Sequence, residues 1–222
     1  MKKPISLLLA TVLIASCTNT AYDTGDSRYS YLRTDFVEAQ TNSSAQLVSA
    51  VTDENTLLTF IRPLSIGWNV TADSVCRAVL YYNMYADAND STKVEPLTVQ
   101  RVFILTPTEV SRQTVVPADP VRFISTWKSS NGAYLNLSIG VMTGKANSME
   151  DKQTIGVVLD SVVERNAHPT YYLRFAHNQG NVPQYYTTTT YFSIPTKTMA
   201  KGSKVRLSLN TYSGWIYREF TW

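Results

Sequence analysis

Few residues of this chain have the types and spacing that enzymatic chemistry requires. The two histidines, His168 and His177, stand apart from both cysteines, so no Cys-His nucleophile has a local signature. The sequence contains no HExxH, CxxC, GxSxG, GxGxxG or P-loop pattern. Cys76 lies in a strand-like run, where a free thiol is typical of a protein core. The residues therefore predict no catalytic group, no metal site and no cofactor.

Carboxylate pairs are the remaining candidates for catalysis, since glycosidases work with two of them. Glu150 is adjacent to Asp151, and Asp87 is followed closely by Asp90. Both pairs lie in segments rich in Ser, Asn and Ala, which favours solvated loops. The segment around Asp87 also lacks the alternating spacing and the distant glutamate of a calcium loop. An envelope hydrolase that acts on glycans through a loop-borne site stays open as an alternative.

Aromatic residues are better placed to bind than to react. Between positions 75 and 85, period-two alternation directs the even positions inward and places Tyr81 and Tyr85 on the outward face. With Trp68, these tyrosines form either a stacking platform for a ligand or a face that packs against another domain. Bare aromatics on one strand would make an aggregation-prone patch, so we expect this face to be covered.

The first seventeen residues indicate export and lipidation. Lys2 and Lys3 precede an apolar stretch that ends in small residues before Cys17. This stretch is shorter than the ~20 apolar residues that a membrane-spanning helix needs. A cysteine at this place is typical of the bacterial lipobox, in which the cysteine is diacylated and becomes the first residue. The sequence predicts an outer-membrane lipoprotein anchored at Cys17, facing either the periplasm or the cell surface.

Charge argues against a nucleic-acid partner. The 20 Lys and Arg against 17 Asp and Glu give +3, and without Lys2 and Lys3 of the leader the balance is +1. A mature chain this close to neutral has no electrostatic footprint for phosphates. With Cys17 acylated, Cys76 has no partner for a disulfide, so the fold depends on its core.

The elements that must position these residues are strands, because the chain after the leader alternates with period two and shows almost no helical periodicity. The expected strands of the first half are 28–40, 46–51, 56–61, 75–85 and 97–105. Those of the second half are 121–128, 134–143, 154–163, 171–176, 186–194, 204–210 and 215–220. Asn131 and Gly132 separate two of them and predict a hairpin.

Five strands followed by seven predict two all-β domains. A closed barrel removes the edges of the first set, and a two-sheet sandwich accommodates the second. The predicted organisation is a signal peptide at 1–17, a tether at 18–27, an OB-like barrel at 28–106, a proline-containing linker at 107–118 and an Ig-like antiparallel β-sandwich at 119–222.

Several segments together resemble the NigD-like lipoprotein family. They are Val99 to Leu105, Ser125-Thr126-Trp127-Lys128, Tyr134-Leu135-Asn136-Leu137, Leu173 to Asn178 and Phe192-Ser193-Ile194-Pro195. The resemblance implies an N-terminal OB-fold, a C-terminal β-sandwich and a place in the envelope of anaerobic bacteria. The family's name derives from a bacteriocin operon, which makes a bacteriocin-immunity role an alternative by analogy.

The sequence as a whole predicts a non-enzymatic, lipid-anchored envelope protein. It binds a protein or glycan partner through a sheet face or loops, and it binds no nucleic acid. The candidate site residues are Cys17 for lipidation and Trp68, Tyr81 and Tyr85 for a ligand or interdomain face.

Overall fold

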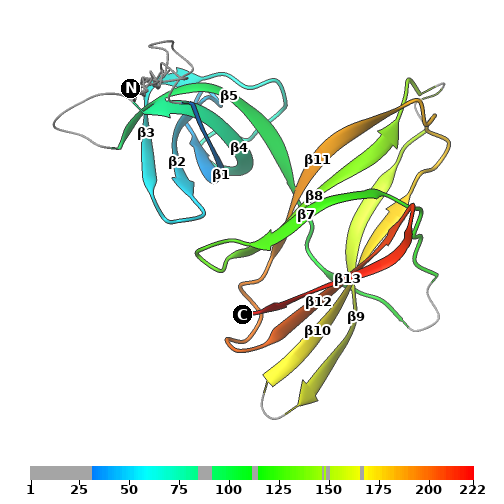
Figure 1. Ribbon diagram of the computed structural model, residues 1–222. Helices are drawn as coiled ribbons and strands as arrows, with labels where there is room; N and C mark the ends of the chain where they lie inside the picture. The colour runs from blue at the N-terminus through cyan, green and yellow to red at the C-terminus, as the bar shows by residue number, and fades with distance from the viewer. Residues whose placement is uncertain (1–31, 85–91, 112–114, 147, 149–150, 166–167) are drawn as a thin grey trace, which may run out of the picture.

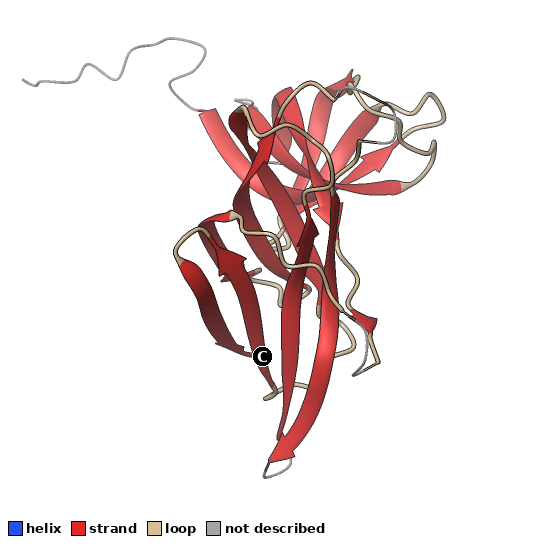
Figure 2. Ribbon diagram, turned by 90° about the vertical axis from the view of Figure 1, so that its right-hand side faces the viewer, coloured by secondary structure: helices blue, strands red, loops and turns tan. Residues whose placement is uncertain are grey.

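The protein consists of two β-structured halves that share one sheet (Figure 1). The computed structural model describes residues 32–84, 92–111, 115–146, 148, 151–165 and 168–222. Figure 2 shows only strands and loops in this part of the chain. The all-β class that the alternation predicts is confirmed. In the same residues, no helix is long and apolar enough to cross a bilayer.

The first half is a ring of five strands. They are β1 (Leu32–Thr41), β2 (Leu47–Thr52), β3 (Leu57–Leu64), β4 (Val75–Met84) and β5 (Lys93–Ile104). The strands pair in the circular order β1-β2-β3-β5-β4, and a short parallel pairing of β3 with β5 closes the ring. The interior holds alternate residues of β4, namely Ala78, Leu80 and Tyr82, as the period-two pattern predicts. The predicted five-stranded, OB-like barrel is confirmed.

The second half is a β-sandwich. Its strands are β6 (Thr108–Glu109), β7 (Arg122–Lys128), β8 (Tyr134–Thr143), β9 (Thr154–Arg165), β10 (His168–Asn178), β11 (Tyr186–Pro195), β12 (Lys204–Thr211) and β13 (Gly214–Thr221). One sheet has the order β13-β12-β10-β9-β6, and the facing strands are β11, β8 and β7. Most pairs are antiparallel, as predicted, but β10 and β12 are parallel because β11, which lies between them in the chain, belongs to the other sheet.

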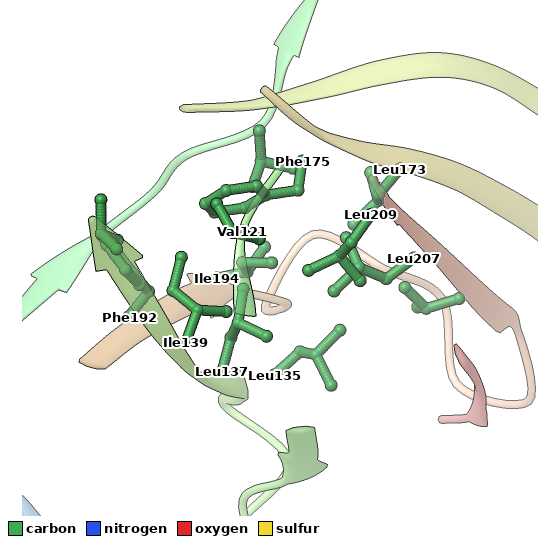
Figure 3. Packing of buried hydrophobic residues seen from close by; sticks show 13 residues of the cluster. Val121, Leu135, Leu137, Ile139, Leu173, Phe175, Phe192, Ile194, Leu207 and Leu209 are labelled. Atoms are coloured by element: carbon green, nitrogen blue, oxygen red, sulfur yellow. The ribbon is translucent and has the colours of Figure 1, made fainter. Parts of the chain in front are cut away.

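The core of the sandwich lies between these two layers. Leu135, Leu137 and Ile139 point inward from β8, and Leu173, Leu207 and Leu209 point inward from β10 and β12 (Figure 3). Each of them is almost completely buried. On β8 they alternate with Asn136 and Ser138, which turn to the other side of the sheet. Burial of this apolar area is the main stabilising contribution to the second half.

Strand β5 connects the two halves through the sheet itself. Its last residues, Val102–Ile104, pair in parallel with Tyr191–Ser193 of β11. The order β3-β2-β1-β4-β5-β11-β8-β7 is therefore one continuous eight-stranded sheet, part of which is rolled into the barrel. Figure 1 shows β5 running from the barrel toward the sandwich.

The segment predicted as a linker lies along the sandwich. Strand β6 falls within it and pairs with Val158 and Leu159 of β9. Further on, the amide of His177 donates to the carbonyl of Pro117, and the amide of Asp119 donates to the carbonyl of His177. The ring of His177 is buried, with Nδ1 at 3.1 Å from the carbonyl oxygen of Asp119. His177 thus holds this segment against β10, while the domain boundaries themselves stay a prediction.

Candidate functional site

The outward face of β4 is covered by the sandwich. We call this contact the seam: it joins β1 and β4 of the barrel to β7, β8 and β11. Phe36 of β1 packs edge-on against Trp127, at 5.0 Å between ring centroids, and against Tyr191, at 5.5 Å. Val79, which pairs with Phe36 across the ladder, is buried as well. Aromatic pairs of this geometry stabilise beyond the area that they bury.

A polar cluster lies next to these rings in the seam. The buried guanidinium of Arg77 forms an ion pair with Asp53, with 2.7 Å between Nη2 and Oδ1, and donates to Ser193 Oγ at 3.2 Å. Asn136 connects the two partners, because its Nδ2 donates to Asp53 at 2.9 Å and its Oδ1 accepts from Ser193 at 2.7 Å. Each half of the protein thus satisfies buried polar atoms of the other half.

Tyr134 completes the seam. Its ring lies under the guanidinium of Arg77, at 4.3 Å from Cζ to the centroid, and its hydroxyl donates to Glu38 Oε1 at 2.6 Å. Burial, followed by the hydrogen bond to Glu38, raises the pKa of Tyr134 to about 12. The polar atoms here are engaged with each other, so the seam is suited to fixing the two halves rather than to catalysis.

The predicted aromatic platform is divided in the structure. Tyr81 is half-buried on the β4 face that meets the sandwich, and burial together with the neighbouring Tyr191 raises the pKa of its phenol. Trp68 lines a separate hollow with Arg101. Tyr85 lies outside the described residues, as does Cys17. The structure therefore does not bring Trp68 and Tyr81 into one hollow, and their role in binding stays a proposal.

The catalytic candidates remain scattered where they are described. His168 begins β10 next to Gly202, far along the sheet from His177. Burial raises the pKa of the Cys76 thiol, and the charge of Arg101 lowers it by a smaller amount. Asp151 accepts the amide of Ser148, while Glu150, Asp87 and Asp90 lie outside the described residues. No three His, Cys, Asp or Glu side chains of the described residues gather to hold a metal.

A second aromatic surface lies on the outer side of the five-stranded sheet. We call it the aromatic face: Trp215 and Tyr217 of β13, Arg206 of β12, Tyr172 and Arg174 of β10, and Asp160 of β9. Trp215 and Tyr217 are 46% and 53% exposed and, two residues apart, point to the same side. Cross-strand register places Tyr217 opposite Ser208, Arg174 next to Ser208, and Tyr172 next to Arg206.

Charged side chains of the aromatic face contact an aromatic ring and each other. The guanidinium of Arg206 lies 4.5 Å from the centroid of the Tyr217 ring, a cation–π distance. Arg174 donates to Asp160 at 2.7 Å, and the ladder between β9 and β10 shifts register beside Asp160. The side chains border a shallow hollow of about 480 Å³.

Sequence reasoning placed the strands of this face but missed the face itself. The available signal was the spacing of Trp215 and Tyr217 in the last strand. That spacing does not predict a binding face, because the cross-strand register is what brings Arg206 and Arg174 beside Trp215 and Tyr217.

Comparison with known families identifies the second half of the chain. The model of the NigD-like C-terminal beta sandwich domain matches residues 103–221. The chain belongs to the NigD-like family. The resemblance inferred from the sequence is thereby confirmed, and the matched region begins within β5, the strand that the two halves share. A search of curated protein sequences gives no match.

Solved structures of similar fold cover most of the chain, including the barrel that lies outside the family model. A NigD-like immunity protein from Bacteroides caccae is 18% identical, with a TM-score of 0.67, over 85% of this chain and 96% of that chain. A candidate lipoprotein from Bacteroides fragilis is 11% identical, with a TM-score of 0.56, over 85% of this chain and 96% of that chain. At these identities the likeness shows the fold alone.

Proposed function

We propose that this NigD-like protein is a non-enzymatic, lipid-anchored protein of the envelope that binds a glycan through the aromatic face. The observation that carries the proposal is the exposure of Trp215 and Tyr217 on one side of β13. Sugars present flat C–H faces that stack on exposed aromatic rings, while their hydroxyl groups need donors and acceptors at the side. Arg174, Arg206 and Asp160 supply such groups around the hollow.

The arrangement of the aromatic face favours a glycan over an apolar ligand. The hollow is shallow and bordered by charged side chains, whereas an apolar ligand gains most from an enclosed, hydrophobic pocket. Arg206 stacks on Tyr217 and so restricts its ring before any ligand arrives. A preorganised platform of this kind reduces the entropic cost of binding.

The lipid anchor of the proposal rests on Cys17 and the leader before it. The solved structure of a candidate lipoprotein with the same fold supports this part. A protein held by acyl chains at its N-terminus can present a folded domain to glycans of the envelope. The non-enzymatic part is supported by the seam, where Arg77, Asp53, Asn136 and Ser193 engage one another rather than a substrate.

The proposed function is tested with the full-length chain purified in detergent. Isothermal titration is carried out with a panel of neutral and acidic oligosaccharides of defined length. Replacing Trp215 by Ala and Tyr217 by Ser together should weaken binding at least ~30-fold, because stacking contributes about 1–3 kcal/mol per ring on nucleic-acid precedent. Tyr186→Ser is the matched control, since Tyr186 is equally exposed but lies on β11.

Two results would contradict the proposal. One is the absence of binding across the panel by the parent protein. The other is a panel member that binds the double variant as tightly as the parent. A protein ligand is the competing candidate, because a structure of the same fold is described as an immunity protein. If the aromatic face binds a protein and no oligosaccharide, the glycan part of the proposal is wrong.

A further inference from the structure

A fork between β4 and β5 opens where barrel and sandwich meet. The ladder between these strands runs from the pair Met84 and Val94 to the pair Ala78 and Arg101, and ends there. Beyond it, residues 75–77 pair with β1 and residues 102–104 pair with β11, each on its far side. In the described residues, neither segment has a strand partner on the side that faces the fork. Unpaired strand edges are sites at which an extended chain can add.

Exposed apolar side chains lie beside the fork, among polar ones. A hollow of about 460 Å³ is lined by residues of both strands and by the loop that carries Trp68. Val75 is 59%, Ile104 50% and Phe103 39% exposed, which are high values for apolar residues from neighbouring strands. A group of exposed apolar side chains at one place is typical of an interaction site.

Space for a side chain continues beyond the fork. Phe103 and Leu105 also line a neighbouring hollow of about 430 Å³, which reaches Val141, Ile155 and Phe192 of the sandwich. The rings of Phe103 and Phe192 lie 5.8 Å apart. An extended ligand lying in the fork can therefore place an apolar group between the layers of the sandwich.

Two arginines line this hollow, and Arg77 is already paired with Asp53 in the seam, which leaves Arg101 for a ligand. The guanidinium of Arg101 lies 4.6 Å from the ring centroid of Phe103, and the same arginine lines the hollow with Trp68. Among the ion pairs and side-chain hydrogen bonds between described residues, Arg101 takes part in none, in contrast to Arg62, Arg77 and Arg174. A guanidinium that lies on an aromatic ring and donates to no other described side chain fits a carboxylate.

We propose that the fork is the docking site for an extended peptide segment of a partner protein that carries one Asp or Glu between aliphatic residues. The carboxylate pairs with Arg101, the aliphatic side chains contact Val75, Phe103 and Ile104, and the main chain meets the free strand edges. The free strand edges favour a peptide over a sugar, because an extended main chain carries N–H and C=O groups at the spacing of a strand and a sugar does not. This site is separate from the aromatic face, so it adds to the proposed function without depending on it.

The test uses an array of acetylated, amidated heptapeptides with a central Asp and flanking Val, Ile, Leu or Phe. Each peptide has a twin in which Asn replaces the Asp. The full-length chain in detergent should bind a subset of the Asp peptides, and bind their Asn twins at least tenfold more weakly. Arg101→Gln should reduce binding of the Asp peptides to the level of the twins. Ile104→Asp should abolish binding to both.

Matched variants establish whether peptide binding is specific to the fork. Arg218→Gln removes another arginine that stacks on a phenylalanine, Phe123 at 4.7 Å, and should bind like the parent. The double variant of Trp215 and Tyr217 should also bind the peptides as the parent does, even where it no longer binds oligosaccharides. The inference is wrong if no Asp peptide binds, if Asn twins bind equally, or if Arg101→Gln binds like the parent. It is also wrong if acidic oligosaccharides, rather than peptides, respond to Arg101→Gln.

Discussion

Replacing Arg77 by methionine tests whether the polar cluster of the seam holds the two halves together. Methionine keeps an unbranched, flexible side chain, shorter than that of arginine, and removes every donor and the charge. Asp53 then loses its ion pair at 2.7 Å, and Asn136 and Ser193 lose the group around which they are arranged. The cation–π contact with Tyr134 disappears as well.

The expected cost follows from burial. The side chains of Arg77 and Asp53 are 1% and 14% exposed, so the variant leaves a nearly buried carboxylate without its cation. Breaking a buried pair from one side costs about 3–5 kcal/mol, and the residual exposure of Asp53 places the expectation at about 3 kcal/mol. For a protein of this size, that corresponds to a fall in Tm of about 6–12 °C. Urea unfolding followed by circular dichroism measures the free energy.

A matched pair elsewhere in the chain provides the control. Arg174 and Asp160 have the same 2.7 Å separation, but their side chains are 29% and 34% exposed. Arg174→Met should cost less than about 1 kcal/mol, because water replaces the lost partner. The double variant with Arg77→Met and Asp53→Leu should regain part of the loss, since it buries no unpaired charge. Equal losses for Arg77→Met and Arg174→Met would refute the reasoning.

Three further predictions address the seam and the anchor. Because the folded pKa of Tyr134 is raised to about 12, its neutral form contributes stability below pH 10 that is lost as pH rises from 10 toward 12; Tyr134→Phe should flatten this part of the unfolding free energy measured against pH. Phe36→Ala should destabilise by about 2–3 kcal/mol in urea unfolding, since it removes both edge-on contacts of a partly buried ring; a loss below about 1 kcal/mol would show that the rings are dispensable. Cys17→Ala should release the protein from the outer membrane and abolish its acyl mass, and a variant that fractionates unchanged would exclude anchoring at this residue.

Most of the fold could be predicted from the sequence because buried strands alternate with period two. The five strands of the barrel and seven of the sandwich lie close to their predicted ranges. The start of β5 was placed too late, at residue 97, because Pro96 argues against a strand interior. The structure accommodates Pro96 where the β4–β5 ladder shifts register beside Tyr82. Strand β6 was missed because two exposed residues carry no periodicity.

The turn after β7 could be predicted from its own residues, but its contacts with the rest of the protein could not. Asn131 and Gly132 predict the reversal between β7 and β8, and Gly132 indeed has a positive φ of 69°. The amide of Asn131 donates to the carbonyl of Asp53 in the barrel, and the carbonyl of Gly132 accepts from Trp222. These partners are distant in the sequence, so the turn could be expected but its role in joining the halves could not.

Period-two alternation is enough to predict the all-β class, the twelve longer strands and the inward side of β4 and β8, and short segments carry the family resemblance. The alternation assigned Arg77 to the outward side of β4, and that assignment holds. Three features depend on the tertiary structure. The outward side of β4 is buried, the guanidinium of Arg77 contacts Asp53, Asn136 and Ser193, and Trp215, Tyr217 and Arg206 share one face. The physical reason is that alternation reports which side of a strand is apolar, whereas the neighbour that covers the other side depends on how distant strands pair and pack.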